Sequence, residues 1–308
     1  MGLPQILVVG SANMDLMIRL PRMPLPGETI LGGEFHMVRG GKGANQAVAC
    51  ARLGASTWML GRVGRDAFGN ELVHGLEADG VRCEYLVRDD TAPSGVAMIL
   101  VDASGENTIA VAPGANMRVT ADDVAIAVRS LDFDAVLCQL EVPIEAIAAA
   151  FQVGRERGAL TILDAGPARA LPPELLSLVD VLSPNRAEAL AILGLEKQEE
   201  PTLEETAQRL LQTGARNVVL KLGAQGALVV SADGLAAVPA FKVDPVDTTG
   251  AGDAFTAALA VSLAEGRELI TATRLAAAAG ALATTVLGAA PSMPTRERLT
   301  QFLDSQGA

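Results

Sequence analysis

Two glycine-rich segments carry the residues best suited to chemistry, and each leads into a helical pattern. The later one, residues 246–255, reads Val-Asp-Thr-Thr-Gly-Ala-Gly-Asp-Ala-Phe. Gly250, Ala251 and Gly252 would present unpaired N–H groups at a helix N-terminus, which favours an anion such as a transferring phosphoryl group. Asp253 follows directly, and a carboxylate beside such a site can accept the proton of an attacking hydroxyl. The alternative is that Asp253 only complements the dipole of its own helix.

The earlier segment, residues 39–45, reads Arg-Gly-Gly-Lys-Gly-Ala-Asn. Its glycines would let a ligand approach the backbone closely. Lys42 and Asn45 supply donors that suit hydroxyl or phosphate oxygens. A tight turn with a solvated lysine would explain the same residues, so this segment alone does not decide.

Composition and missing motifs exclude several classes of function. The 308 residues hold 24 Lys and Arg against 36 Asp and Glu, and the net charge of −12 disfavours nucleic acid and anionic membranes as partners. With two histidines and three widely spaced cysteines, the chain has no HExxH or CxxC pattern, which argues against zinc chemistry and fits a reducing cytoplasm. Complete P-loop and GxGxxG motifs are also missing from the sequence.

The elements that must position these segments follow from hydrophobic periodicity. Short apolar runs predict strands at Ile6–Val9, Thr57–Leu60, Ala135–Cys138, Leu160–Leu163, Val179–Ser183 and Asn217–Leu220. Three- and four-residue spacing predicts helices at Gly43–Leu53, Ala67–Asp79, Ile144–Arg157, Asn185–Leu193 and Leu203–Gln212, and an Ala-rich internal helix at Leu275–Ala290. This alternation predicts an α/β fold with a doubly wound, mostly parallel sheet and helices on both faces.

Two regions, 13–38 and 95–112, break the alternation because no helical pattern separates their strand-like runs. The second has the form of a hairpin around residues 102–106. We expect both to form a small β-sheet lid within a single domain, 1–308. Ordinary surface hairpins are the alternative.

Six segments, in this order, resemble the ribokinase-like carbohydrate kinase family: Gly10–Asp15, Gly40–Asn45, Gln139–Glu141, Pro184–Glu188, Lys221–Gly223 and Asp247–Asp253. The resemblance spans nearly the whole chain, and the joint occurrence of the Gly-Gly-Lys-Gly-Ala-Asn and Asp-Thr-Thr-Gly-Ala-Gly-Asp turns is very specific. The segments at 26–29, 105–107, 114–116 and 288–292 look most like those of members that act on D-ribose.

The resemblance implies a role for each matching residue. The sugar would be held by Asn13, Asp15, Gly41, Lys42, Asn45, Glu141 and Asp253. The nucleotide and its Mg²⁺ would lie near Asn185, Glu188, Lys221, Gly223, Gly226, Gly250 and Gly252. A monovalent cation, K⁺, would be bound by Asp247, Ser292 and the carbonyl groups of Thr249, Ala283, Val286 and Gly288.

The implied reaction is transfer of the ATP γ-phosphoryl group to the 5-hydroxyl of D-ribose, with Asp253 as base. Alternatives are a kinase for deoxyribose, a ketose phosphate or a nucleoside, and a sugar sensor without catalysis. A phosphorylated sugar would need an extra basic cluster near the lid, for which Arg39 is the obvious candidate. Lys221 would either reach a phosphate or extend into solvent. An exposed lid edge would also favour a homodimer.

Overall fold

Nine strands form the central sheet of the computed structural model, which describes residues 2–195 and 201–307. Their order is β13-β12-β11-β10-β9-β8-β1-β4-β5, and every pairing from β11 to β5 is parallel. The strands are β1 (Gln5–Val9), β4 (Ser56–Gly64), β5 (Arg82–Asp89), β8 (Ala135–Cys138), β9 (Leu160–Asp164), β10 (Val181–Ser183), β11 (Asn217–Lys221), β12 (Ala227–Ser231) and β13 (Gly234–Val238). The sheet confirms the predicted doubly wound, mostly parallel α/β fold.

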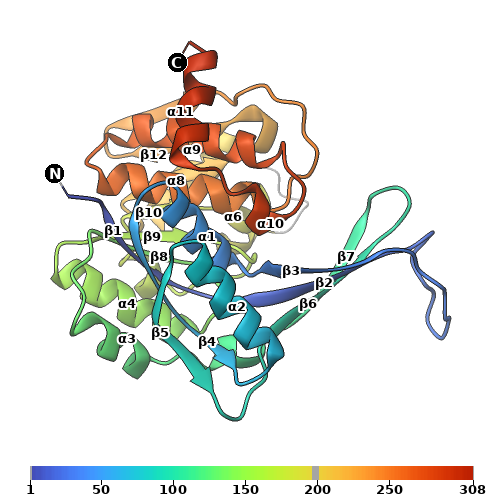
Figure 1. Ribbon diagram of the computed structural model, residues 1–308. Helices are drawn as coiled ribbons and strands as arrows, with labels where there is room; N and C mark the ends of the chain where they lie inside the picture. Colours follow the sequence, from blue (N-terminus) through green and yellow to red (C-terminus); the bar gives the residue numbers. More distant parts are fainter. Residues whose placement is uncertain (1, 196–200, 308) are drawn as a thin grey trace.

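Helices cover both faces of this sheet, as Figure 1 shows. Consecutive strand residues point to opposite faces, so Ile6 and Val8 of β1 pack in one apolar cluster while Leu7 and Val9 pack in the other. The first cluster contains α1 (Lys42–Arg52), α2 (Ala67–Ala78), α8 (Ala251–Ala264), α9 (Leu269–Ala283) and α11 (Arg296–Ser305). The second contains α3 (Ala121–Val128), α4 (Ile144–Glu156), α5 (Pro173–Leu176), α6 (Arg186–Ile192) and α7 (Leu203–Gln212).

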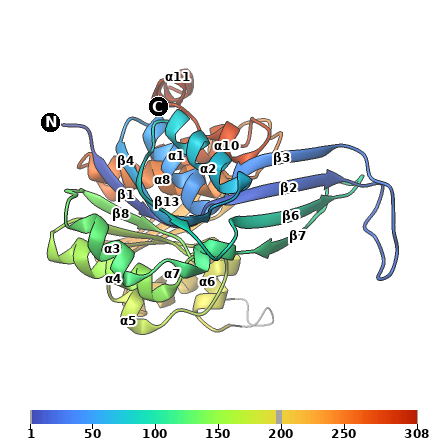
Figure 2. The same cartoon turned by 60° about the horizontal axis from the view of Figure 1, so that its bottom comes forward.

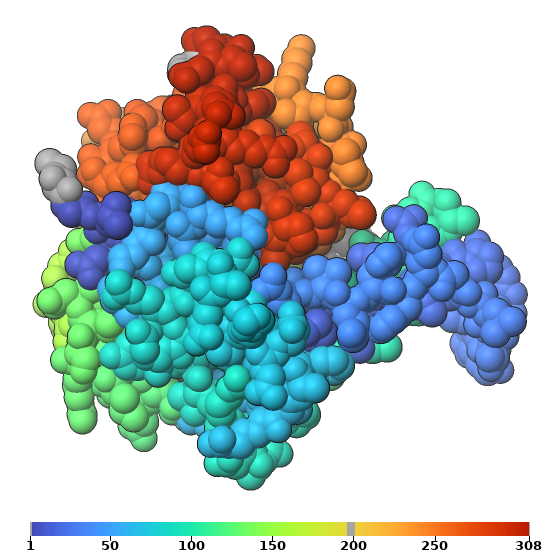
Figure 3. All heavy atoms as spheres, viewed as in Figure 1, coloured from blue at the N-terminus to red at the C-terminus, as the bar shows by residue number. Residues whose placement is uncertain are grey.

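A separate four-stranded sheet, the lid, projects from one side of the body (Figures 2 and 3). It consists of β2 (Asn13–Arg19), β3 (Phe35–Gly40), β6 (Gly95–Val101) and β7 (Asn107–Ala112), in the order β3-β2-β6-β7. Strand β2 runs parallel to β6 and antiparallel to β3, so two segments far apart in sequence make one sheet. The two regions expected to form a lid therefore join as predicted.

Helix α8 lies at the centre of the first layer, between α1 and α9 and against β1, β8 and β9. Its residues from Asp253 to Ser262 are all buried, and four of these ten are alanine. Small side chains let the helix approach its neighbours closely, while alanine keeps a high helix propensity. The first turn of α8 is thereby fixed relative to the sheet.

The Ala-rich helix near the C-terminus differs from the prediction of Leu275–Ala290. Helix α9 starts earlier, at Leu269, and ends at Ala283. The hydroxyl groups of Thr284 and Thr285 donate to the carbonyls of Ala281 and Leu282, both at 2.7 Å, which satisfies the last turn. The chain then turns into the short helix α10 (Ala289–Ser292). None of the helices in the described ranges is both long and apolar enough to cross a membrane.

Candidate active site

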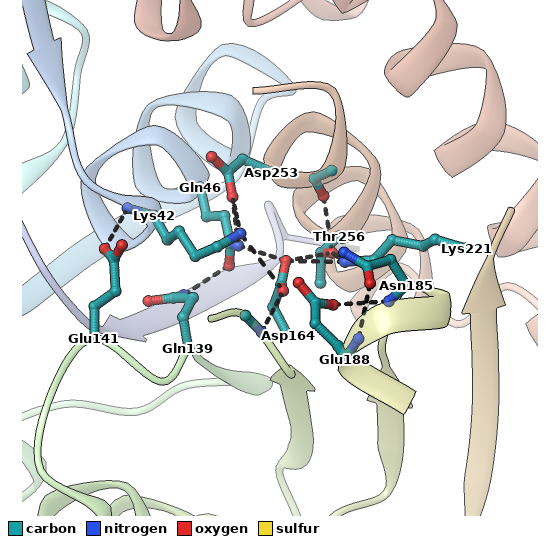
Figure 4. A network of polar contacts seen from close by, with 12 residues as sticks. Lys42, Gln46, Gln139, Glu141, Asp164, Asn185, Glu188, Lys221, Asp253 and Thr256 are labelled. Carbon is teal, nitrogen blue, oxygen red and sulfur yellow. Dashed lines mark hydrogen bonds and ion pairs between the residues drawn. The ribbon is translucent and has the colours of Figure 1, made fainter. Parts of the chain in front are cut away.

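The candidate site lies at the carboxyl ends of the parallel strands, where open α/β sheets bind their ligands. Asn13 lies just beyond β1, and Glu141 lies beyond β8. Asp164 and Lys221 are the last residues of β9 and β11. Helix α1 and the first turn of α8 close this edge from one side (Figure 4).

The turn before α1 depends on two glycines. Gly41 is the N-cap residue and has a φ of 90°, a conformation that residues with a side chain rarely adopt. A Cβ on Gly43 would lie 2.5 Å from the backbone nitrogen of Ser11, so α1 begins in direct contact with the turn after β1. The Ser11 hydroxyl and the Lys42 amide both donate to Oε2 of Glu141, the latter at 3.0 Å. The sequence-distant segments around 11, 42 and 141 are thus held together.

Asp253 is buried in the first turn of α8, and its side chain points to α1 rather than to its own helix N-terminus (Figure 4). Asn45 donates to Oδ2 at 2.9 Å, and Gln46 donates to Oδ1 at 3.0 Å. The ammonium group of Lys42 lies 3.4 Å from Oδ1. Asp253 therefore makes contacts with α1 in addition to its place in the first turn of α8.

The bend before Asp253 is half-buried and offers backbone N–H groups. Gly250 caps α8 with a φ of 78°, and a Cβ there would lie 2.7 Å from a methyl carbon of Met293. The amide of Ala251 donates to the carbonyl of Thr248 at 3.2 Å, so it is not free as the sequence had suggested. Within the described chain the amides of Gly250, Gly252 and Asp253 have no backbone acceptor and remain available to an anion.

Asp164 is fully buried and connects the two halves of the site. Its Oδ2 accepts hydrogen bonds from Gln46 at 2.9 Å, Thr256 at 3.0 Å and Lys221 at 3.2 Å, and Lys42 lies 3.8 Å from Oδ1. Burial would raise the pKa of Asp164, but the charges of Lys221 and Lys42 outweigh it and hold the pKa below its ordinary value. The carboxylate therefore stays ionised between two ammonium groups.

Lys221 does not extend into solvent, which was one of the two alternatives for this residue. Its side chain is only 11% exposed and turns inward onto Asp164, with Thr256 at 3.4 Å. The ammonium group lies 3.8 Å from the position that a Cβ on Gly252 would take. Lys221 thus places a buried positive charge beneath the bend instead of extending into solvent.

Lys42 occupies the middle of the site. Burial disfavours its charge, yet Asp164, Asp253, Glu188 and Glu141 together raise the pKa of Lys42 well above its ordinary value. The lysine is therefore an ammonium group at neutral pH and is not suited to act as a base.

Two residues at the base of the lid face the same space. Asn13 is buried, and its Oδ1 accepts a hydrogen bond from Asn116 at 2.7 Å. Burial, with the charges of Glu141 and Asp253, raises the pKa of Asp15 to about 7. Both side chains lie where the lid joins the body, and their polar groups suit a polyol.

The proposed nucleotide residues lie on the other side of Asp164. Asn185 and Glu188 form a reciprocal N-terminal cap on α6, with distances of 2.9 and 2.7 Å. Gly223 is exposed in the turn η2 (Gly223–Gln225) after β11. Gly226 is buried against β13, where a Cβ would lie 2.0 Å from the carbonyl oxygen of Val238.

The loop residues expected to bind K⁺ surround Asp247. Its carboxylate accepts bonds from the amide of Thr249 at 2.9 Å and of Gly288 at 2.8 Å, which joins two loops. Burial would raise the pKa of Asp247, but these hydrogen bonds outweigh it and keep the pKa below its ordinary value. Next to it, Val286 donates to the carbonyl of Ala283 at 3.2 Å, and the buried Ser292 hydroxyl donates to Ala289 at 2.7 Å.

Arg39 lies away from this space. Its guanidinium group packs against Gly75 of α2, where a Cβ would overlap it, and lies 3.7 Å from Asp79. The register of β2 and β3 pairs Arg39 with Met14, whose side chain faces opposite to that of Asp15. The one candidate for an extra phosphate-binding cation is therefore occupied elsewhere.

Sequence reasoning missed several residues of the site. Asp164 could have been found as a charged residue that ends an apolar strand. Gln46 lies four positions after Lys42 and so shares its helix face. Gln139, Ser11 and Asn116 lie in quoted motifs without an assigned role, because only the tertiary structure shows what they contact.

Comparison with known proteins gives close matches over the whole chain. The model of the pfkB family of carbohydrate kinases matches residues 3–296. The ribokinase of Bacillus subtilis (strain 168) is 38% identical, over 97% of this chain and 99% of its own. The deoxyribokinase of Salmonella typhi is 33% identical, over 97% and 98%. The solved structure of Arabidopsis thaliana ribokinase complexed with ribose and ATP has a TM-score of 0.89 at 34% identity, over 98% of this chain and 99% of that chain.

Proposed function

The chain belongs to the pfkB family of carbohydrate kinases, and from that premise we propose that it transfers the ATP γ-phosphoryl group to the 5-hydroxyl of D-ribose. The observation that carries the proposal is Asp253: a buried carboxylate, held by three donors, beside free amides at the start of α8. The ribose kinases among its relatives, which match over nearly their full length, favour this sugar.

In the proposed mechanism, Asn13, Asp15 and Glu141 hold the sugar hydroxyls, and Asp253 accepts the proton of the attacking hydroxyl. The amides of Gly250 and Gly252 stabilise the charge on the transferred group. Closure of the lid would exclude water, which is the competing acceptor.

Mg²⁺ would neutralise charge on the nucleotide phosphates when it is bound. Glu188 fits this role, since its Oε1 accepts no hydrogen bond within the described chain and a carboxylate oxygen is a ligand that Mg²⁺ prefers. Asn185, at the same helix end, would orient the phosphates.

An assay of ADP release across D-ribose, 2-deoxyribose, fructose 1- and 6-phosphate and nucleosides tests the substrate. We expect the highest kcat/KM with D-ribose. The site favours a neutral sugar over a sugar phosphate, because Asp15 and Glu141 face the substrate and Arg39 does not. A preference for 2-deoxyribose would move the assignment to that alternative, and the absence of ADP release with every sugar would favour a sensor.

The pH dependence of sugar binding is expected to follow Asp15. Its pKa of about 7 means that the carboxyl is protonated below that pH and ionised above it. Because an ionised carboxylate accepts hydrogen bonds from hydroxyls more strongly, KM for D-ribose should fall as the pH rises through about 7. Asp15→Asn should flatten this dependence in steady-state kinetics, whereas an unchanged slope would assign the titration to another group.

The raised pKa of Asp15 also makes the free energy of unfolding depend on pH, and it does so in the opposite direction to sugar binding. A pKa raised from 3.8 means that between about pH 4 and 7 the folded protein binds the Asp15 proton more tightly than the unfolded chain does. This contribution to the free energy of unfolding is present at low pH and is lost as the pH rises through that window.

Activation by K⁺ is expected from the loops around Asp247. The described chain pairs no basic side chain with this ionised, half-buried carboxylate, and the surrounding carbonyl oxygens are hard ligands. We expect kcat to rise several-fold when KCl replaces NaCl at equal ionic strength, and Asp247→Ala to abolish the difference. Equal rates of the wild type in the two salts would contradict the assignment of Asp247, Thr249, Ala283, Val286, Gly288 and Ser292.

The lid also suggests a homodimer. Five apolar residues on its strands are at least half exposed: Phe35, Met37, Met98, Ile109 and Val111. Burial of such a surface against a second lid would stabilise a symmetric pair, which light scattering can detect.

We further propose that residues 1–308 act as one kinase domain in the cytoplasm.

A further inference from the structure

Gln46 is a fully buried residue of α1 that contacts both carboxylates at the centre of the site (Figure 4). Its Nε2 lies 2.9 Å from Oδ2 of Asp164 and 3.0 Å from Oδ1 of Asp253. Its Oε1 accepts a hydrogen bond of 2.6 Å from Nε2 of Gln139, which follows β8. One amide group therefore connects the end of β9, the start of α8 and the end of β8.

The direction of this amide is set by its neighbours. Ionised carboxylates only accept hydrogen bonds, so the NH₂ group of Gln46 must face Asp164 and Asp253. Its oxygen then needs a donor, which Gln139 provides. The NH₂ group of Gln139 therefore faces Gln46, and its Oε1 faces Gly10. In the described chain this Oε1 is buried without a donor. An unpaired buried acceptor is costly, so the pairing with Gln46 must outweigh that cost.

The contacts also distinguish the two oxygens of Asp253. Oδ1 is occupied by Gln46 and Lys42, whereas Asn45 is the one donor to Oδ2 among residues 2–195 and 201–307. Oδ2 is therefore the oxygen left to receive a proton from a bound hydroxyl. The charged groups around Asp253 are Lys42 on α1, Asp15 on β2, Glu141 after β8, Asp164 on β9 and Lys221 on β11.

We propose that Gln46 is a positioning residue for the base: its NH₂ group fixes Asp253 through Oδ1, so that Oδ2 faces the substrate hydroxyl, and Gln139 fixes the direction of that amide. The inference rests on the proposed function, because it assigns Gln46 a role through Asp253. Without the amide, Lys42, at 3.8 Å from Asp164 and 3.4 Å from Asp253, would be left as the bridge between the two carboxylates.

Gln46→Met keeps the length of the side chain and removes both donors. We expect kcat to fall roughly 10- to 100-fold, because two hydrogen bonds to charged groups are lost. The acidic limb of the kcat profile should move upward by about one pH unit, since a carboxylate that loses one of its donors holds its proton more tightly. KM for ATP should stay near the wild-type value. Gln46 has no direct hydrogen bond to a residue proposed to bind the nucleotide and is linked to Lys221 only by way of Asp164.

Cys50→Ala is the matched control. Cys50 lies one turn further along α1, is equally buried, and packs against α8 at Ala257 without touching Asp253. It should lower the melting temperature with no change in the acidic limb. A shift of the limb in this control, or an unshifted limb in Gln46→Met, would overturn the inference.

A second measurement separates this inference from the proposed function. The carboxyl pKa of Asp253 can be measured by ¹³C NMR, with Asp253→Asn used to assign the signal. An upward shift in Gln46→Met supports the positioning role even if the wild type phosphorylates a different sugar. Lack of ADP release with every sugar, in contrast, overturns the proposed function, and an unshifted carboxyl signal overturns the role of Gln46.

Discussion

Asp253→Asn should lower kcat by roughly 10²- to 10⁴-fold while D-ribose still binds, because a positioned base contributes about that much to a proton transfer. The substitution keeps the size of the side chain and removes the charge that accepts the hydroxyl proton. It also places an NH₂ group where one carboxylate oxygen now accepts from Asn45 or Gln46, so the remaining activity should be low at every pH. Steady-state kinetics give kcat, and calorimetric titration gives the affinity for the sugar.

A control must separate base catalysis from a helix-dipole effect. Asp122 also lies in the first turn of its helix, α3, but is exposed, and α3 packs on the opposite face of the sheet from α8. Asp122→Asn should leave kcat within about twofold of the wild type, since a surface charge at a helix end contributes only about 0.3–1 kcal/mol to stability. Near-normal turnover of Asp253→Asn would remove Asp253 from the proposed mechanism.

Asp164→Ala should lower the free energy of unfolding by about 3–5 kcal/mol, the usual loss when one partner of a buried ion pair is removed. The change leaves Lys221, which is 11% exposed, with only the Thr256 hydroxyl as partner, and it also removes an acceptor from Gln46. Urea-induced unfolding followed by circular dichroism measures the difference.

Two further variants test the physical cause. The double variant Asp164→Ala/Lys221→Met removes the unpaired ammonium group and should recover part of the lost stability. Asp180→Ala is the matched buried control, because its partner Arg216 is 67% exposed and can return to water. A loss in Asp180→Ala as large as in Asp164→Ala would mean that the buried cations are not responsible.

Much of the fold could be predicted from the sequence because hydrophobic periodicity reports burial. The Ala135–Cys138 strand and the Leu203–Gln212 helix have the predicted bounds, since buried runs there end at clear polar boundaries. Strand β5 was missed because it lies at the edge of the sheet, where charged side chains such as Arg82 and Glu84 interrupt the apolar pattern. The end of α9 was missed because composition alone does not show that threonine hydroxyls satisfy its last carbonyls.

The site was predictable where its residues are adjacent in sequence. The two glycine-rich turns placed Lys42, Asn45 and Asp253, which the structure brings into contact. The inward turn of Lys221 could not be predicted, because it depends on Asp164, a residue 57 positions earlier in the chain. Hydrogen bonds between residues on separate strands and helices leave no periodic pattern in the sequence. The network around Asp164 is therefore seen only in the three-dimensional structure.

In the proposed mechanism, Asp15 of the lid binds the sugar, whereas the transfer takes place at the start of α8. Asp253, Gln46 and Asp164 belong to buried helices and strands, whereas Asp15 belongs to a sheet that projects from the body (Figure 2). A change in the projecting sheet can alter which hydroxyls are recognised without rebuilding the transfer centre. Substitutions in the lid can therefore change the preferred substrate while the residues around Asp253 stay the same. The lid is accordingly the part of the molecule in which to engineer a new substrate preference.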